Sequence, residues 1–190
     1  MTRPRDISET DYTNIPNIRA LCQNIGIALI ACQTAEKLIN LSLLVLFPKG
    51  PIRTVEMFDH LDEKQRRKTL GYLIRGLRQR VGIDQQFDAL LGDFLQHRNT
   101  LAHDLTGLPG HSFFTPVGLD RINRFVLRLV DEAQRVTEIF AAFIDTWTDR
   151  MGMSERLAQQ QPDIYDSDFI ANIRVSITPL LDALIYEKPK

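Results

Sequence analysis

The chain has 190 residues, of which 44% are hydrophobic and 25% charged, and its formal net charge is -1 at pH 7. This length suits one domain with its own core and leaves too little chain for two. The composition is that of a soluble globular protein. The small net charge excludes a protein that coats nucleic acid by bulk charge, although a local basic face is still allowed.

The first 15 residues, MTRPRDISETDYTNI, contain no apolar core of a secretory signal, and we expect a flexible N-terminus there. The most apolar run, residues 25–47, is interrupted by polar side chains, so we do not expect a membrane span. Cys22 and Cys32 fall in the same predicted helix, about 15 Å apart, which is too far for a disulfide. Free cysteines favour a reducing compartment, and we expect a cytoplasmic protein.

Helical periodicity, Pro and Gly predict one all-α domain over residues 16–185 and a flexible C-terminus at 186–190. The expected helical regions are 16–47, ended by PKGP; 54–80, with a break near 59–62; 84–105; 116–151; and 166–184, with a bend at Pro179. Two of these helices are long. Short loops between them predict an antiparallel bundle of about five helices.

The stretch from Ile25 to Phe47 is apolar on almost every side of its predicted helix. Such a helix is buried all round. We therefore expect it to be the central helix of the bundle, or one that also meets a second subunit.

Two charged residues interrupt the apolar stripes of the predicted helices. Arg98 falls within the stripe of helix 84–105, and Glu36 falls within that of helix 16–47. The apolar members are Phe87, Leu91, Phe94, Leu101 and Leu105 on the former and Ile18, Ile25, Leu29, Cys32, Leu43 and Phe47 on the latter. Burying an unpaired charge is costly, so we predict that Glu36 and Arg98 pair inside the bundle. The alternative is that each side chain reaches an edge of the bundle and meets water.

A second face of helix 84–105 is polar. Gly92, Gln96, Asn99 and His103 share a side of the helix away from Arg98. Glycine allows another backbone to come close, so this face is a candidate surface for a partner subunit.

The segment RNTLAH, from Arg98 to His103, resembles the signature of HEPN domains, in which a polar residue follows the arginine and the histidine comes four to six residues later. KTLGYLIRGL, at 68–77, resembles the preceding helix of small bacterial proteins of this type. The resemblance covers roughly residues 18–143, and residues beyond 143 add nothing to it.

The resemblance implies a homodimer joined through the motif-bearing helix and a metal-independent ribonuclease of the toxin or phage-defence type, without a cofactor. Arg98 and His103 are then the catalytic residues, and Asn99, Glu36 and Asp104 support them. An antitoxin or a regulatory protein is an expected partner, although Leu105 stands where some toxins of this type carry a modified tyrosine. The alternative is a non-catalytic HEPN-like protein that binds RNA or a partner.

Between Lys64 and Arg80 there are seven basic residues and no acidic one. Candidate RNA contacts in this region are Arg66, Arg67, Lys68, Arg75 and Arg78, and a further basic row on helix 116–151 is formed by Arg121, Arg124, Arg128 and Arg135. The alternative for both sets is an ordinary solvated helix face. Asp93 and His97 lie one turn apart, but no third ligand has a recognisable spacing, so no metal site is expected.

Overall fold

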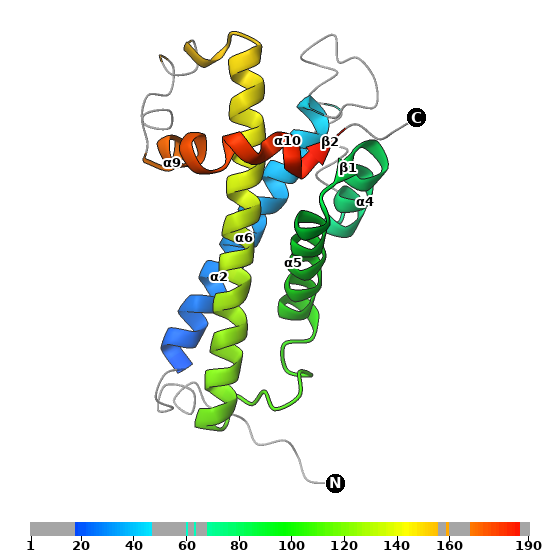
Figure 1. The fold of residues 1–190 in the computed structure, drawn as a ribbon. Coiled ribbons are helices and arrows are strands. Elements are labelled where there is room, and N and C mark those ends of the chain that lie inside the picture. Colours follow the sequence, from blue (N-terminus) through cyan, green and yellow to red (C-terminus); the bar gives the residue numbers. More distant parts are fainter. Residues whose placement is uncertain are drawn as a thin grey trace.

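The structure is a computed structural model that describes residues 18–46, 60, 63, 68–155, 159 and 168–186. Within these residues the protein is an all-α bundle, as the periodicity predicted (Figure 1). The predicted flexible N-terminus, most of residues 54–67 of the predicted helical region 54–80, and the last four residues lie outside the described residues.

Four helices form the body of the bundle: α2 (Ile18–Val45), α4 (Leu70–Arg80), α5 (Gln85–His103) and α6 (Pro116–Arg150). Side-chain caps begin three of them. Thr69 precedes α4 and accepts from the N–H of Tyr72, Asp84 accepts from the first turn of α5, and Thr115 accepts from the N–H of Gly118 in α6. Each cap satisfies a backbone donor that the helix itself leaves open.

The two longest helices, α2 and α6, pack side by side and run in the same direction (Figure 1). Asn24 Nδ2 donates to Asn123 Oδ1 at 2.7 Å near their N-terminal ends. Helix α5 runs opposite to α6, as His97 lies beside Glu132 while Phe87 lies beside Phe140. The prediction of antiparallel neighbours is therefore right for α5 and α6 and wrong for the two long helices. Because α5 returns the chain to the starting end of the bundle, α6 must run parallel to α2.

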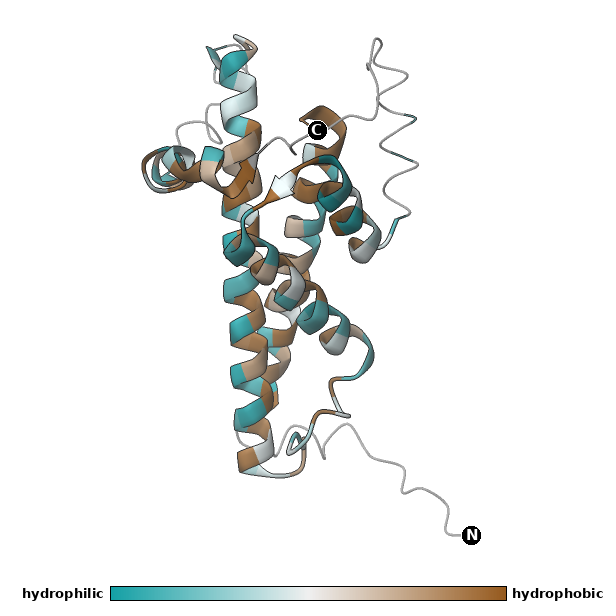
Figure 2. Cartoon of the chain, turned by 45° about the vertical axis from the view of Figure 1, so that its right-hand side comes forward, coloured by the Kyte–Doolittle hydropathy of each residue, from teal (hydrophilic) through white to brown (hydrophobic). Residues whose placement is uncertain are grey.

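The core lies where these helices meet. Figure 2 shows hydrophobic and hydrophilic residues alternating along α6, as expected of an amphipathic helix. Its apolar side joins that of α2 and α5 in one cluster, in which Leu91, Phe94, Leu129 and Phe140 are completely buried. Each such side chain contributes about 2 kcal/mol by leaving water.

Within one chain helix α2 is not buried all round, so it is not an enclosed central helix, and the alternative, that it also meets a second subunit, stays a prediction. Leu29 is 43% exposed, Ile27 53% and Ile30 67%. Ala28 and Cys32 of the same helix are buried. Helix α2 is the one described helix long and apolar enough to cross a membrane, and 44% of its apolar window is buried within the bundle. A core helix of a soluble protein passes the same test, and the fold is compatible with one.

The C-terminal segment crosses α6 and ties it to the turn before α5. It contains α9 (Asp168–Ser176), the 3-10 helix η1 (Thr178–Leu180) and α10 (Leu181–Leu184). The bend predicted at Pro179 is confirmed, because this proline stands in the first turn of η1, where it interrupts the helical hydrogen bonding; the region predicted as one helix over 166–184 is therefore divided into three pieces. The last strand, β2 (Ile185–Tyr186), pairs with β1 (Gly82–Ile83) in an antiparallel ladder.

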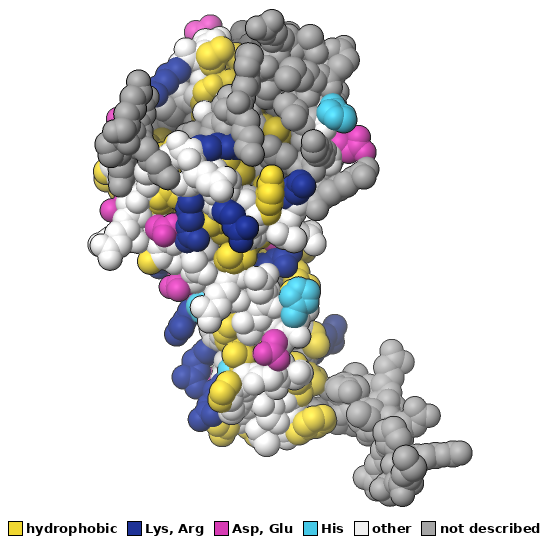
Figure 3. Space-filling view, turned by 90° about the vertical axis from the view of Figure 1, so that its right-hand side faces the viewer, with side chains coloured by type: hydrophobic (Ala, Val, Ile, Leu, Met, Phe, Trp, Pro, Cys, Tyr) yellow, Lys and Arg dark blue, Asp and Glu magenta, His cyan; other side chains and the backbone are white. Residues whose placement is uncertain are grey.

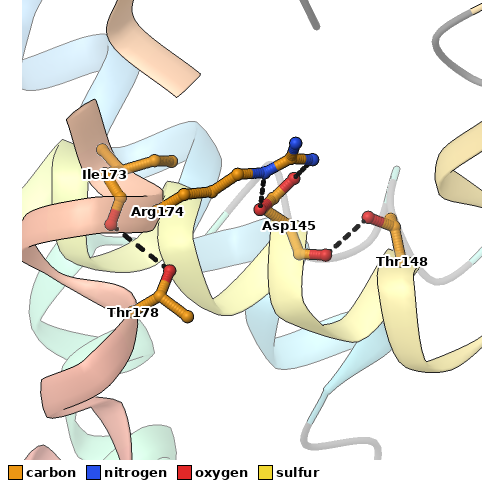
Figure 4. Close-up of polar contacts among 5 residues, drawn as sticks. All are labelled: Asp145, Thr148, Ile173, Arg174 and Thr178. Carbon is orange, nitrogen blue, oxygen red and sulfur yellow. Dashed lines mark hydrogen bonds and ion pairs between the residues drawn. The ribbon is translucent and has the colours of Figure 1, made fainter. Parts of the chain in front are cut away.

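A polar contact fixes α9 on α6 (Figure 4). Arg174 Nε and Nη2 each donate to one oxygen of Asp145 at 2.8 Å, and Asp145 is only 7% exposed. Thr148 donates to the carbonyl of Asp145, and Thr178 donates to the carbonyl of Ile173. The segment beyond residue 143, which adds nothing to the sequence resemblance, is thus an integral part of this fold.

Candidate functional site

Helix α5 presents the motif on two faces, as its periodicity predicted. Phe87, Leu91 and Phe94 are buried, and Arg98 continues their line along the helix. Asn99 and His103 lie on the exposed side. His103 is the last residue of α5, so its imidazole stands at the end of the helix in contact with solvent.

The predicted pair between Glu36 and Arg98 is confirmed. Arg98 Nε donates to Glu36 Oε1 at 2.7 Å, which connects α5 to α2. The pair is not sealed in the core, because the two side chains are 31% and 23% exposed respectively. Arg98 is therefore held in place by an ion pair and still reaches the surface.

Asn99 contacts Arg98. The Arg98 Nη1 group donates to Asn99 Oδ1 at 3.4 Å, a long hydrogen bond at an exposed position. The guanidinium of Arg98 is thus bounded by Glu36 on one side and by Asn99 on the other. Asn99 was expected to support Arg98 and His103, and within the described residues its hydrogen bond is with Arg98.

Asp104 follows the motif and closes the end of α5. Its N–H donates to the carbonyl of Thr100, and its own carbonyl accepts from the N–H of Gly107. Its carboxylate folds over Gly107 so closely that a Cβ at that position would collide with it. This geometry makes Asp104 a residue of the turn that follows α5.

A second pair, between a histidine and a glutamate, lies directly beside the Glu36–Arg98 pair. The sequence did not predict it. His97 Nδ1 is 2.8 Å from Glu132 Oε2 and 3.0 Å from Oε1, and the Glu132 residue is only 8% exposed. The ring of His97 meets Phe125 edge-on at 5.4 Å, and His111 meets the same phenyl ring at 6.2 Å. Glu132 borders the apolar stripe of α6 next to Leu129 and Ala133. This position is the feature of the sequence that could have indicated its burial.

Cys32 lies near both pairs. The pKa of its thiol is raised to about 12, mainly by burial and also by the charges of Glu36 and Glu132, while Arg98 acts in the opposite direction. A buried thiol with so high a pKa is protonated at neutral pH and is a poor nucleophile. The part of the chain that the structure describes holds no group of three or more His, Cys, Asp or Glu residues placed to bind a metal ion, and Asp93 with His97 does not form one.

Gly92, on the polar face of α5 that was expected to contact a partner subunit, lies close to another helix of the same chain. A Cβ at Gly92 would sit 3.9 Å from Arg78 Nη2 of α4, so α4 covers part of the strip that was expected to face a partner. Further along, Gln96, Asn99 and His103 are exposed.

The candidate RNA contacts separate into three groups. Arg66 and Arg67 lie outside the described residues. Lys68, Arg75 and Arg78 are all exposed, and Arg78 is bound to Asp88 at 2.7 Å.

On α6, two arginines of the basic row pair with the aspartate four residues earlier, Arg124 with Asp120 and Arg135 with Asp131. Such exposed pairs reduce the net positive charge of the row, which accordingly fits a solvated helix face better than a strong anion site.

No protein family model, curated protein or solved structure matches this chain.

Proposed function

We propose that the protein is a HEPN-like, cytoplasmic, metal-independent ribonuclease of the toxin or phage-defence type, active as a homodimer. Arg98 and His103 are the catalytic residues of a site that two subunits complete. The observation that carries the proposal is the position of His103. It is solvent-exposed at the end of α5, five residues after an arginine that is anchored and still accessible.

The chemistry explains why two subunits are needed. In cleavage through the 2′-hydroxyl, a base takes the hydroxyl proton, the oxygen attacks phosphorus, and an acid protonates the departing 5′-oxygen. The products are a 2′,3′-cyclic phosphate and a 5′-hydroxyl end. Within residues 85–150, His97 is engaged by Glu132 and His111 Nδ1 is directed at loop carbonyls, which leaves His103. A second His103, from a second copy, supplies the other group.

Arg98 provides positive charge that offsets the negative charge developing on the phosphate during the reaction. A guanidinium can donate two parallel hydrogen bonds to phosphate oxygens and stabilise the added negative charge. Glu36 takes the Nε donor, so it holds the guanidinium in one orientation. Glu36 is thus a positioning residue in this proposal, and Asn99 is a second contact of the same group.

A non-catalytic HEPN-like protein that binds RNA or a regulatory partner such as an antitoxin is the second candidate. The contacts of Arg98 with Glu36 and Asn99 favour it, because they occupy donors that a phosphate would use.

The deciding experiment compares purified wild type with His103→Ala on total RNA in the presence of a chelator. We expect cleavage by the wild type and none by the variant, which keeps its fold because His103 is exposed. Mixing the two proteins in equal amounts and exchanging subunits should leave roughly a quarter of the dimers with both histidines, and activity should fall to that level. A wild type that does not cleave RNA would support the second candidate, and activity in a monomer would refute the composite site.

A further inference from the structure

At the start of α4 an exposed aromatic side chain lies between a basic residue that precedes the helix and a basic residue on it. Tyr72 is 46% exposed, and Lys68 Nζ lies 4.9 Å from the centre of its ring. Arg75 is exposed three residues after Tyr72, on the same side of the helix. We propose that this surface, Lys68–Tyr72–Arg75, is a docking site for single-stranded RNA. This docking site adds a class of substrate to the proposed ribonuclease function, and the inference rests on that function.

These residues are part of the longer basic segment between Lys64 and Arg80, and the structure distinguishes them from its other described members. Of the basic residues on α4 itself, Arg80 turns inward and donates to the carbonyl of Leu43 at 2.8 Å, and burial lowers its pKa. Arg78 is bound to Asp88 of α5. Lys68 and Arg75 thus provide the positive charge that faces solvent on either side of Tyr72.

The combination of an aromatic ring and flanking cations suits a single strand. Unpaired bases stack on exposed aromatic rings, while Lys and Arg contact the phosphates that connect them. A duplex hides the faces of its bases and could use only the charges. The sequence of α4, LGYLIRGLRQR, contains no acidic residue that would repel phosphate.

The surface lies beside the helix that bears His103. A Cβ at Gly71, next to Tyr72, would sit 3.7 Å from Leu95 Cδ2 of α5. Leu95 precedes His103 by eight residues, about 12 Å along the helix. Figure 3, which looks onto α4 and α5, shows Lys and Arg side chains gathered across the middle of this face. A strand docked on α4 can therefore extend along α5 towards His103.

The test measures binding of the full-length protein carrying His103→Ala, so that the RNA is not cut. The probes are a fluorescent oligouridylate and an RNA duplex of equal charge, each titrated over a range of salt concentrations. Added Tyr72→Leu should weaken oligouridylate binding about tenfold, and added Tyr72→Phe should keep it. Added Arg75→Gln should reduce the slope of log affinity against log salt by about 0.7. Arg135→Gln, which removes a paired arginine of α6, is the matched control and should change neither.

The proposal is overturned if the Tyr72→Leu variant binds like the Tyr72→Phe variant, if the duplex binds as tightly as the single strand, or if no RNA binds. Binding of an acidic peptide that competes with RNA and does not depend on Tyr72 would also overturn it, and would mark a protein contact. The two proposals fail separately. A wild type that binds RNA through Tyr72 without cleaving it refutes only the nuclease, and a nuclease indifferent to Tyr72 refutes only the docking surface.

Discussion

Glu132 of α6 holds His97 at 2.8 Å, and His97 directly precedes Arg98, which Glu36 of α2 holds at 2.7 Å. Two successive residues of α5 are thus bound to carboxylates on two different helices. Together with the buried stripe of Phe87, Leu91 and Phe94, the pairs fix the rotation of α5 and its position along the bundle. The direction of Arg98 and the place where His103 emerges both follow from them.

The His97–Glu132 pair should contribute substantially to stability. Replacing Glu132 with alanine leaves His97 without its partner at a largely buried position, and we expect unfolding free energy to fall by about 2–3 kcal/mol. Urea denaturation measures this loss. The matched control is Glu138→Ala on the same helix, which removes a contact with Gln134 and should cost less than about 0.5 kcal/mol. Equal losses in the two variants would show that the pair has no special role.

The Glu36–Arg98 pair should be weaker, because water reaches both side chains. A double-mutant cycle with Glu36→Gln and Arg98→Gln should give a coupling free energy of about 1 kcal/mol at low salt. Added salt should reduce it, since mobile ions screen charges at a partly exposed site. Strictly additive losses would mean that the contact contributes nothing to stability.

The two cysteines should differ sharply in reactivity. Cys22 is exposed, whereas Cys32 is buried with its pKa raised from the usual 9.0 to about 12. A thiol reagent at neutral pH should modify Cys22 rapidly and Cys32 only when the protein unfolds. Mass spectrometry of the peptides distinguishes the two sites. Rapid labelling of Cys32 in the native protein would contradict its burial.

The same shift predicts a dependence of stability on alkaline pH. The folded state favours the neutral thiol of Cys32, so this contribution is complete below about pH 9 and is lost as pH rises towards 12. Unfolding free energy should therefore decline over this range by more in the wild type than in Cys32→Ala. Parallel declines would indicate that other groups, such as tyrosines and lysines, account for the whole effect.

The Asp145–Arg174 contact should control docking of the C-terminal segment. Asp145→Asn removes the charge that accepts both guanidinium donors, and we expect a loss of about 2 kcal/mol. Hydrogen exchange should accelerate first at 168–186, because α9 and α10 depend on this contact and on a small apolar cluster. Asp149→Asn, at an exposed position one turn later, is the control and should leave exchange in α9 unchanged. Uniform acceleration across the bundle would show that the segment does not open by itself.

Much of the site could be predicted because helical periodicity relates sequence position directly to a face. The stripe of Phe87, Leu91 and Phe94 placed Arg98 towards the core and left His103 outside. Glu36 was recognised by the same logic, as a charge in an apolar line. Glu132 was missed because it borders its stripe, where a solvent-facing carboxylate is equally common. The parallel course of α2 and α6 depends on the path of the intervening chain, about which periodicity carries no information.

The sequence by itself determined which residues form helices, where caps and prolines end them, and which side of each helix is apolar, since these are properties of neighbouring residues. Only the tertiary structure decided which polar groups meet. It brought Glu132 to His97 across 35 positions, left Ile27 and Ile30 exposed on an apolar helix, and laid the C-terminal segment over α6. The physical reason is that an apolar stripe shows only which face of a helix is stabilised by burial. Packing of the whole chain determines what covers it.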